Sequence, residues 1–189
     1  MDGMSRPFVI AVNSISGGGK TSLANVMHDC LPNSTLFRFD DFDATNLYPT
    51  DFHDWYRRGG NLEEFDCLGM KAAVDAEIQK AEVKYIVLDY PFGRDHSRFR
   101  DVIDLSIYID TPLDVALARR IMRDFVPRAE IAPQVQFRRL RDELSYYLAK
   151  GRPIYLDNRH IHTCDLKLDG LKPLDELRDQ VLEAVGIRI

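Results

Sequence analysis

The segment best suited to chemistry is a glycine-rich loop that follows an apolar run near the start of the chain. It reads Asn13-Ser14-Ile15-Ser16-Gly17-Gly18-Gly19-Lys20-Thr21-Ser22. Consecutive glycines let backbone N–H groups converge on a phosphate, and a helix that begins there adds partial positive charge. Lys20 can then reach the β- and γ-phosphates of a nucleotide, and the Thr21 hydroxyl can ligate Mg²⁺. The loop therefore predicts a binding site for a nucleoside triphosphate and Mg²⁺.

The loop departs from the pattern G-x-x-x-x-G-K-[ST] at one position, because Ser14 stands where the pattern has its first glycine. We expect this serine to alter the entry of the loop and its nucleotide affinity, while the cradle from Gly17 to Thr21 is kept. The alternative interpretation is a glycine-rich turn that merely ends a strand. The residues expected to contact the nucleotide are Ser16, Gly17, Gly18, Gly19, Lys20, Thr21 and Ser22.

Two acidic positions follow apolar segments elsewhere in the chain. Asp40 comes directly after residues 35–39, and Asp89 ends the apolar segment 86–88. In a parallel sheet the carboxyl ends of the strands face the ligand crevice, so both acids would lie near the phosphates. Asp40 can orient an acceptor hydroxyl and take its proton, and Asp89 can hold Mg²⁺ directly or through water. Either acid can instead belong to a solvated turn, although the upstream loop favours the functional interpretation of Asp89.

Three arginines, Arg119, Arg120 and Arg123, lie within an arc of about 100° on a predicted helix. Arginines so placed can lean over a phosphate and neutralise charge during its transfer. The segment that follows contains two prolines and no clear periodicity, and we expect a mobile lid over about residues 119–133. The alternative is a solvated basic helix face that pairs with nearby acids.

Aromatic and histidine residues give weaker signals. Residues 55–58, Trp-Tyr-Arg-Arg, can stack on a planar substrate base and contact its substituents, or they can fix a loop, and both interpretations stay open. His160 and His162 are interpreted as surface or packing histidines, because no acid or thiol follows them at ligand spacing.

Strands and helices alternate along the whole chain. Apolar runs predict buried strands at 8–12, 85–88 and 105–109, while 35–39 and 165–168 alternate more and are placed nearer the sheet edges. Such alternation predicts an α/β sandwich with a central parallel sheet. Without a repeat or a linker in the sequence, we expect one domain over residues 1–189.

Helices are expected between the strands. One runs from Lys20 to before Pro32, another covers about 68–81, and a third opens with Thr111 as its N-cap. A fourth is predicted over 133–150, with Gly151 as its stop and an inward face made of Phe137, Leu140, Leu144 and Leu148. The last helix is expected to turn inward Leu174, Leu177, Val181 and Val185.

Composition excludes several classes of protein. The 189 residues are 45% hydrophobic and 29% charged, which excludes wholesale disorder. The net charge of −5 does not favour a nucleic-acid or anionic-membrane partner. No apolar run approaches the roughly 20 residues that span a bilayer, and the sequence shows no signal-peptide pattern. The three cysteines lie far apart and suggest neither a disulfide framework nor a zinc site, so we expect a cytoplasmic protein of undetermined oligomeric state.

These segments together resemble the uridine kinase and phosphoribulokinase group of P-loop kinases, which includes the nicotinamide riboside kinases. The resemblance is carried, in order, by Ser16–Leu23, Leu31–Asn33, Asp40–Phe42 and, most specifically, Asp104–Thr111 followed by Leu117–Asp124. It implies a P-loop NTPase three-layer sandwich with a helical lid. It further implies that Asp40 contacts the acceptor hydroxyl and that Arg119, Arg120 and Arg123 are lid arginines, with Arg120 on the nucleotide.

Two departures from the family bear on the acceptor. The chain has Asp89-Tyr90 where the family usually has Glu-Gly, which would bring a bulky side chain beside the acceptor pocket. Residues 47–66 match the family only loosely. The resemblance therefore implies familiar chemistry on an acceptor that need not be uridine.

The expected activity is transfer of the γ-phosphoryl group of ATP, with Mg²⁺, to the hydroxyl of a small molecule such as a nucleoside or another ribosyl compound. A nucleoside monophosphate kinase is an alternative, but a phosphate acceptor would need cations where the chain has Asp40. A P-loop ATPase that acts as a switch or binding module is a second alternative. The chain lacks the Asn-Lys-x-Asp motif that the commonest GTPase switches use to read guanine.

Overall fold

The computed structural model describes residues 6–126, 132–157 and 159–187, and within them five parallel strands form one sheet in the order β2-β3-β1-β4-β5. The strands are β1 (Phe8–Asn13), β2 (Ser34–Arg38), β3 (Tyr85–Asp89), β4 (Leu105–Asp110) and β5 (Leu166–Asp169). The predicted strands and the parallel sheet are confirmed, and the two segments that alternate more in sequence are the two edge strands.

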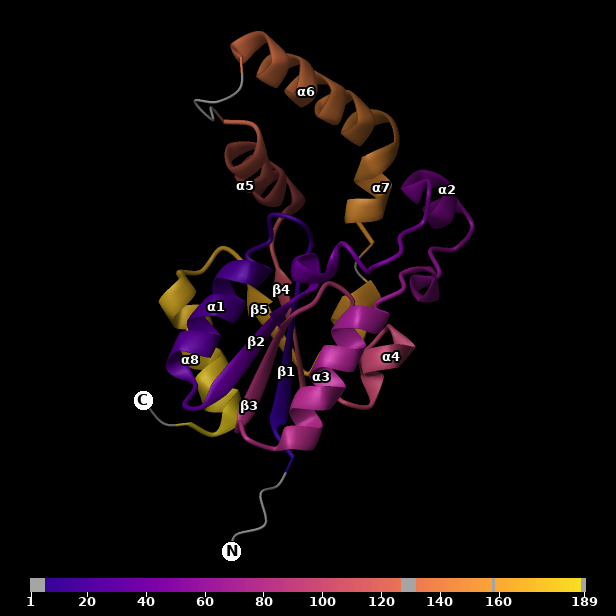
Figure 1. Cartoon of the computed structure of the whole chain (residues 1–189). Coiled ribbons are helices and arrows are strands. Elements are labelled where there is room, and N and C mark those ends of the chain that lie inside the picture. Colours follow the sequence, from indigo (N-terminus) through magenta and orange to yellow (C-terminus); the bar gives the residue numbers. More distant parts are fainter. Residues whose placement is uncertain (1–5, 127–131, 158, 188–189) are drawn as a thin grey trace, which may run out of the picture.

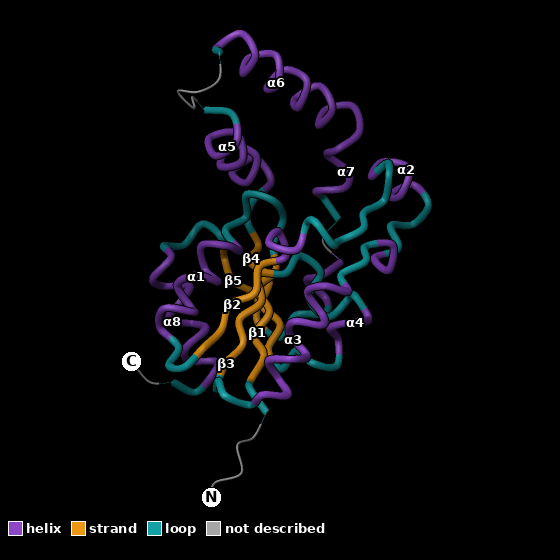
Figure 2. Tube along the Cα trace, in the orientation of Figure 1, coloured by secondary structure: helices purple, strands orange, loops and turns teal. Residues whose placement is uncertain are grey.

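Helices cover both faces of this sheet (Figure 1). The α-helices described by the structure, on the sheet and beyond it, are α1 (Lys20–Cys30), α2 (Phe52–Arg57), α3 (Leu68–Lys80), α4 (Ser97–Arg100), α5 (Leu113–Asp124), α6 (Pro133–Tyr146), α7 (Arg152–Tyr155) and α8 (Leu174–Val185). Helices α1 and α8 lie on one face, and α3 and α4 lie on the other, so the predicted three-layer sandwich is confirmed (Figure 2). Among the described residues, no helix is both long and apolar enough to cross a membrane.

The central strand explains why the first apolar run has no polar face. Val9 and Ala11 belong to the core under α3 and α4, whereas Ile10 and Val12 belong to the core under α1 and α8. All four side chains are fully buried. Each large apolar side chain buried in this way contributes about 1.5–3 kcal/mol, so the first strand is a main source of stability.

The start of α5 differs from the prediction. Its N-cap is Pro112, which offers no side-chain hydrogen bond, and the helix begins at Leu113. Thr111 is buried, and its hydroxyl donates to the Gly18 carbonyl at 2.8 Å. The expectation that Thr111 caps the helix is wrong because its hydroxyl bonds to the glycine-rich loop instead.

The segment 133–150 also differs from the prediction, because it does not pack on the sheet. Helix α6 ends at Tyr146, a π-helical turn covers Tyr147–Gly151, and α7 continues, so Gly151 does not stop the helix. Phe137 is 69% exposed and Leu148 is 76% exposed, and no residue of α6 is buried. We call α5, α6, the π-helical turn and α7 the arm, which rises from the carboxyl edge of the sheet in Figure 1.

The remaining differences are small. In α8, Leu177 and Val181 are buried as predicted, but Leu174 is 38% exposed. Residues 159–162 form a 3₁₀ turn, so the two histidines of this segment do not lie on a strand. Residues 127–131 of the expected lid lie outside the described residues. The structure describes the rest of that segment, in α5 and at the start of α6.

Candidate functional site

The glycine-rich loop joins the carboxyl end of β1 to the first residue of α1, as the sequence predicts. Gly17 and Gly19 have φ values of +84° and +103°, in the left-handed region that favours glycine. A Cβ on Gly17 would lie 2.1 Å from the Ala116 carbonyl oxygen, so the loop packs directly on α5. The glycines therefore serve both the turn and the approach of α5 to the loop.

Ser14 has a structural role at the position where the loop pattern has glycine. Its side chain is buried, and its hydroxyl donates to the Ile109 carbonyl of β4 at 2.8 Å. A Cβ on Gly18 would lie 1.8 Å from the same hydroxyl oxygen. Together with the Thr111 bond, this contact ties the loop to β4 at two points.

Lys20, Thr21 and Asp89 form a compact charged cluster beneath the loop. The Thr21 hydroxyl donates to Asp89 Oδ2 at 2.6 Å, and Lys20 Nζ lies 3.3 Å from Asp89 Oδ1. Asp89 is only 3% exposed, and its Oδ1 accepts no hydrogen bond in the described part of the chain. Burial of a carboxylate is costly unless a cation compensates it, and Lys20 is that cation. Asp89 is next to Val12 in the register of β1 and β3, so strand pairing places it below the loop.

The same cluster has the donor set of a magnesium site. Mg²⁺ prefers oxygen ligands, and it commonly keeps several waters and binds one or two carboxylates together with nucleotide phosphates. Thr21 and Asp89 offer a hydroxyl and a carboxylate, and one carboxylate oxygen accepts no hydrogen bond. No group of three acidic, histidine or cysteine residues that could enclose a metal occurs among the described residues. The residues present therefore fit an ion that nucleotide phosphates would help to hold.

A hollow of about 1040 Å³ lies above the loop, and we call it the loop hollow. Its lining includes the predicted residues Lys20, Thr21, Asp40, Arg119 and Arg123. The guanidinium of Arg119 donates to the Gly170 carbonyl at 3.2 Å. The Nη2 atom of Arg123 lies 3.5 Å from the Ser16 hydroxyl oxygen. The fold therefore brings together predicted residues from the loop, the end of β2 and α5.

The other wall of the loop hollow was not predicted from the sequence. It consists of the connection between β5 and α8 and the start of α8, namely Gly170, Leu171, Lys172, Pro173, Leu174 and Leu177. A Cβ on Gly170 would lie 1.8 Å from the Thr111 hydroxyl oxygen, so this connection also packs against the residue that supports the loop. Apart from Lys172, which pairs with Glu176 at 3.5 Å, these residues have no ionisable side chain. Their position after the carboxyl end of a parallel strand is the one signal that marks them.

Asp40 and its neighbour Asp41 point in different directions. They lie in a 3₁₀ turn, Phe39–Phe42, in which successive side chains point about 120° apart. Asp40 is exposed in the loop hollow. The carboxylate of Asp41 lies 3.7 Å from the Arg38 guanidinium, and Asp41 is not part of the hollow's lining.

Arg120 does not join the other two arginines in the loop hollow. Its side chain is only 9% exposed, and its Nη2 donates to Glu143 Oε1 at 2.6 Å. Its Nη1 donates to the Tyr155 hydroxyl, and the guanidinium carbon lies 4.7 Å from the centre of that ring. The structure thus places the side chain of Arg120 between α5, α6 and α7, outside the lining of the loop hollow.

A second cavity, of about 330 Å³, lies on the other side of the loop and shares Ile15 with the loop hollow. We call it the aromatic cavity. Its lining consists of Asn13, Ser14, Ile15, Ser16, Phe52, Trp55, Leu62, Phe65, Pro91, Phe92, Tyr108, Tyr146, Gly151, Ile154, Tyr155 and Asp157. Burial raises the pKa of Tyr108 to about 12, so this phenol stays protonated at neutral pH.

Trp55 fulfils one of the two roles that the sequence left open, the fixing of a loop, while stacking on a substrate base stays a prediction. Its indole N–H donates to the Asn61 carbonyl at 2.8 Å, and its ring meets Phe65 edge-on at 5.2 Å, so it fixes the loop. It also forms part of the wall of the aromatic cavity. Arg58 pairs instead with Asp54 and Glu64 and lies outside that lining.

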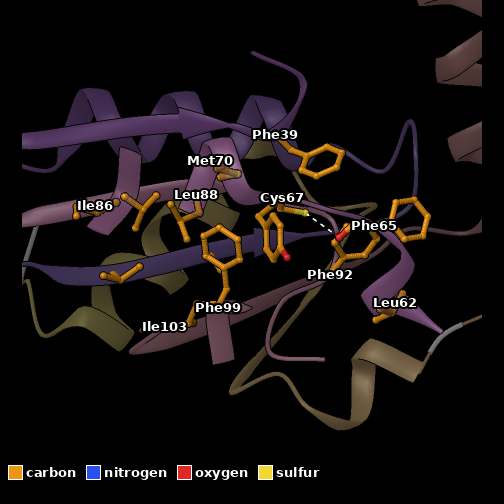
Figure 3. Close-up of a cluster of buried hydrophobic side chains, with 14 of the residues drawn as sticks. Phe39, Leu62, Phe65, Cys67, Met70, Ile86, Leu88, Phe92, Phe99 and Ile103 are labelled. Atoms are coloured by element: carbon orange, nitrogen blue, oxygen red, sulfur yellow. Dashed lines mark hydrogen bonds between the residues drawn. The ribbon is translucent and has the colours of Figure 1, made fainter. Parts of the chain in front are cut away.

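Tyr90 does not reach the aromatic cavity, although the sequence placed it beside the acceptor. It is fully buried and packs against Phe99 at 4.5 Å and Phe92 at 5.4 Å between ring centres. Figure 3 shows the surrounding cluster, in which Phe39, Phe65 and Phe92 lie together and the Cys67 thiol bonds to the Phe65 carbonyl. Burial raises the pKa of Tyr90 well above its usual range. Tyr90 thus supports the cavity from below through Phe92.

Comparisons with known proteins show which family the chain is similar to. Residues 77–138 match the model of the Phosphoribulokinase / Uridine kinase family. A uridine kinase of Limosilactobacillus reuteri is 27% identical over 176 residues, which cover 79% of this chain and 76% of the relative. A uridine kinase of Borrelia turicatae is 25% identical over 169 residues, covering 78% of each chain.

Solved structures support the fold. A gluconokinase from Sinorhizobium meliloti superimposes with a TM-score of 0.52 at 17% identity, covering 96% of this chain and 93% of the other. The tunicamycin resistance protein of Deinococcus radiodurans gives 0.51 at 18% identity, covering 97% and 98%. The sheet order, the loop and these structures define a P-loop NTPase fold. Within that class, the chain is similar to the phosphoribulokinase and uridine kinase family of kinases, which confirms the resemblance seen in its motifs.

Proposed function

We propose that this protein transfers the γ-phosphoryl group of ATP to a hydroxyl of a small molecule, a nucleoside or a related ribosyl compound. The observation that carries the proposal is the convergence of Lys20, Thr21, Asp40 and Arg123 on one hollow. The aromatic cavity opens on the other side of the same loop and offers a place for the body of the acceptor. The uridine kinases among the relatives support an acceptor of this class.

The proposed mechanism follows from the positions of these side chains. Lys20 and the backbone N–H groups of the loop bind the β- and γ-phosphates, and Thr21 and Asp89 would hold Mg²⁺. The bound ion would supply charge neutralisation on the phosphate oxygens. Asp40 orients the acceptor hydroxyl and takes its proton as the hydroxyl oxygen bonds to the γ-phosphorus and the bond to the bridging oxygen breaks. Arg119 and Arg123 stabilise the charge on the transferring group.

The far wall of the loop hollow offers a surface on which the base of the nucleotide can bind. Arg119 bonds to the Gly170 carbonyl, and the residues after Gly170 continue the wall as far as Leu177 on α8. We propose that the base lies between Arg119 and this connection. A planar base gains from an apolar floor and from a guanidinium against its face.

The charge around the aromatic cavity argues against a phosphate acceptor. Among the described residues that line it, Asp157 is the one with an ionisable charge at neutral pH, and no lysine, arginine or histidine is present. A nucleoside monophosphate would place a dianion beside a carboxylate with no cation to compensate it. A hydroxyl acceptor is therefore favoured over a phosphate acceptor.

We further propose that residues 1–189 act as one kinase domain and that the segment of about 119–133 serves as its lid. In support, the described strands form one sheet, and α5 carries Arg119 and Arg123 to the rim of the loop hollow. Because Gly17 of the loop packs directly on Ala116 of α5, a movement of this helix would also displace the loop that binds the phosphates.

A coupled assay of ADP release tests the proposed function. The protein is incubated with ATP and Mg²⁺, alone and with a panel of nucleosides, free sugars and nucleoside monophosphates. Stimulation by one nucleoside or sugar supports the proposal, stimulation by a monophosphate supports the alternative kinase, and release that no compound stimulates supports an ATPase switch. Lys20→Ala is the control, because it removes the cation that binds the phosphates and should abolish turnover. Wild-type turnover in Lys20→Ala would refute the assignment of the loop.

A further inference from the structure

The arginines of α5 face two different places. Arg119 and Arg123 line the loop hollow, whereas Arg120 is enclosed between α5 and the rest of the arm. A guanidinium that is 9% exposed cannot exchange its partners for water without cost, so its contacts fix the relative positions of the elements that supply them. Those partners are Glu143 of α6 and Tyr155 of α7.

Tyr155 connects this cluster to the aromatic cavity. Its hydroxyl accepts the hydrogen bond from Arg120, its ring lies under the guanidinium at 4.7 Å, and the residue also lines the cavity. Ile154, its neighbour, lines the same cavity and packs against the core cluster that contains Trp55. One end of the Arg120 cluster is therefore the phosphate-facing helix, and the other end is a wall of the aromatic cavity.

We propose that Arg120 is a positioning residue that couples the loop hollow to the aromatic cavity. This proposal rests on one part of the proposed function, namely that the loop hollow binds a nucleotide. When a nucleotide draws Arg119 and Arg123 toward its phosphates, α5 carries Arg120 with it, and the bonds to Glu143 and Tyr155 transmit the displacement to the cavity wall. Nucleotide binding thereby adjusts the acceptor side of the site, although Arg120 touches neither substrate.

The sequence supplies a reporter for this coupling. Trp55 is the only tryptophan in the chain, and it lines the same cavity as Tyr155. Its fluorescence therefore reports the cavity wall without knowledge of the acceptor. The experiment titrates the full chain with ADP and Mg²⁺, records the fluorescence of Trp55, and measures ADP affinity separately by calorimetry.

Two variants and a matched control separate the coupling from simple loss of charge. Glu143→Gln removes the charge that compensates Arg120, and Tyr155→Phe removes only the hydroxyl and keeps the ring. Asp142→Asn is the matched control, because it removes the same charge from the adjacent residue of α6, whose side chain is 65% exposed and lies near Arg141. Thermal unfolding of each variant shows whether it is folded. If Glu143→Gln is not folded, Tyr155→Phe alone tests the coupling.

The expected result is that ADP changes Trp55 fluorescence in the wild type and in Asp142→Asn, and that the change is lost in Glu143→Gln and Tyr155→Phe at unchanged ADP affinity. A wild-type response in these two variants, or ADP binding to the wild type without a fluorescence change, would overturn the coupling. A weaker ADP affinity in Arg120→Lys would place Arg120 on the phosphates and also overturn it. Failure of the wild type to bind ADP would refute the nucleotide site itself, and the coupling with it.

Discussion

Replacement of Asp40 by asparagine removes the charge and basicity of the candidate catalytic carboxylate while keeping its size. Asp40 is exposed on a 3₁₀ turn at the rim of the loop hollow, so the substitution leaves the core untouched. Loss of a general base typically lowers the rate about 10²–10⁴-fold. At about 1.36 kcal/mol for each factor of ten, this is roughly 2.7–5.4 kcal/mol of transition-state stabilisation.

Asp41→Asn is the matched control for Asp40→Asn. Asp41 forms an ion pair with Arg38 at 3.7 Å, and the two side chains are 61% and 39% exposed. Surface pairs of this kind contribute at most about 1 kcal/mol to stability. We therefore expect kcat of Asp41→Asn to stay close to that of the wild type and its melting temperature to change little.

The assay is steady-state ADP release with the acceptor that the panel identifies, together with calorimetric titration of ATP into each variant. The expected result is a large fall in kcat for Asp40→Asn and unchanged ATP affinity, because Asp40 is proposed to face the acceptor hydroxyl. Equal kinetics for the two asparagine variants would refute the role of Asp40. A loss of ATP affinity confined to Asp40→Asn would instead place this carboxylate on the nucleotide or its metal.

Three further predictions follow from the same geometry. Thr21→Ala should raise the Mg²⁺ concentration needed for half-maximal turnover, because one oxygen ligand is lost, and an unchanged Mg²⁺ dependence would show that Thr21 is no ligand. Arg123→Ala should lower kcat more than it changes the acceptor KM, since its charge acts on the transferring group, and a selective rise in that KM would place it in the acceptor pocket. Gly17→Ala should lower stability by about 1–3 kcal/mol in thermal denaturation, because a Cβ would lie 2.1 Å from the Ala116 carbonyl oxygen at a φ of +84°. Gly19→Ala is its control, since a Cβ there meets nothing within 4 Å, and an equal loss in both variants would refute the contact argument.

Most of the fold could be predicted because its signals are local. An apolar run with no polar face marks a strand buried on both sides, and β1, β3 and β4 are strands of this kind. Helix periodicity was less informative for α6, since it shows which residues share a face but not whether another element covers that face. Phe137 and Leu148 share such a face and are both exposed.

The candidate site could be predicted where residues follow a strand. Lys20 and Asp40 come after the carboxyl end of a strand, Asp89 is the last residue of one, and parallel pairing brings such ends to one edge. Their catalytic roles stay predictions. The environment of Arg120 could not be predicted, because Glu143 and Tyr155 are 23 and 35 residues further along the chain. Their meeting depends on how the arm returns to the sheet, which no local pattern encodes.

The order of the strands has a consequence for how the protein is made. The central strand β1 leaves the ribosome first, but Phe8 pairs with Tyr85, and Ile10 pairs with both Val87 and Leu105. At about 5–20 residues per second, β1 waits several seconds during synthesis for its neighbours. Throughout that interval Val9, Ile10, Ala11 and Val12 have no sheet to bury them. Such non-local pairing is slow and leaves apolar segments open to aggregation. The stage before β3 and β4 are made is therefore the one at which a holding chaperone would protect this protein most.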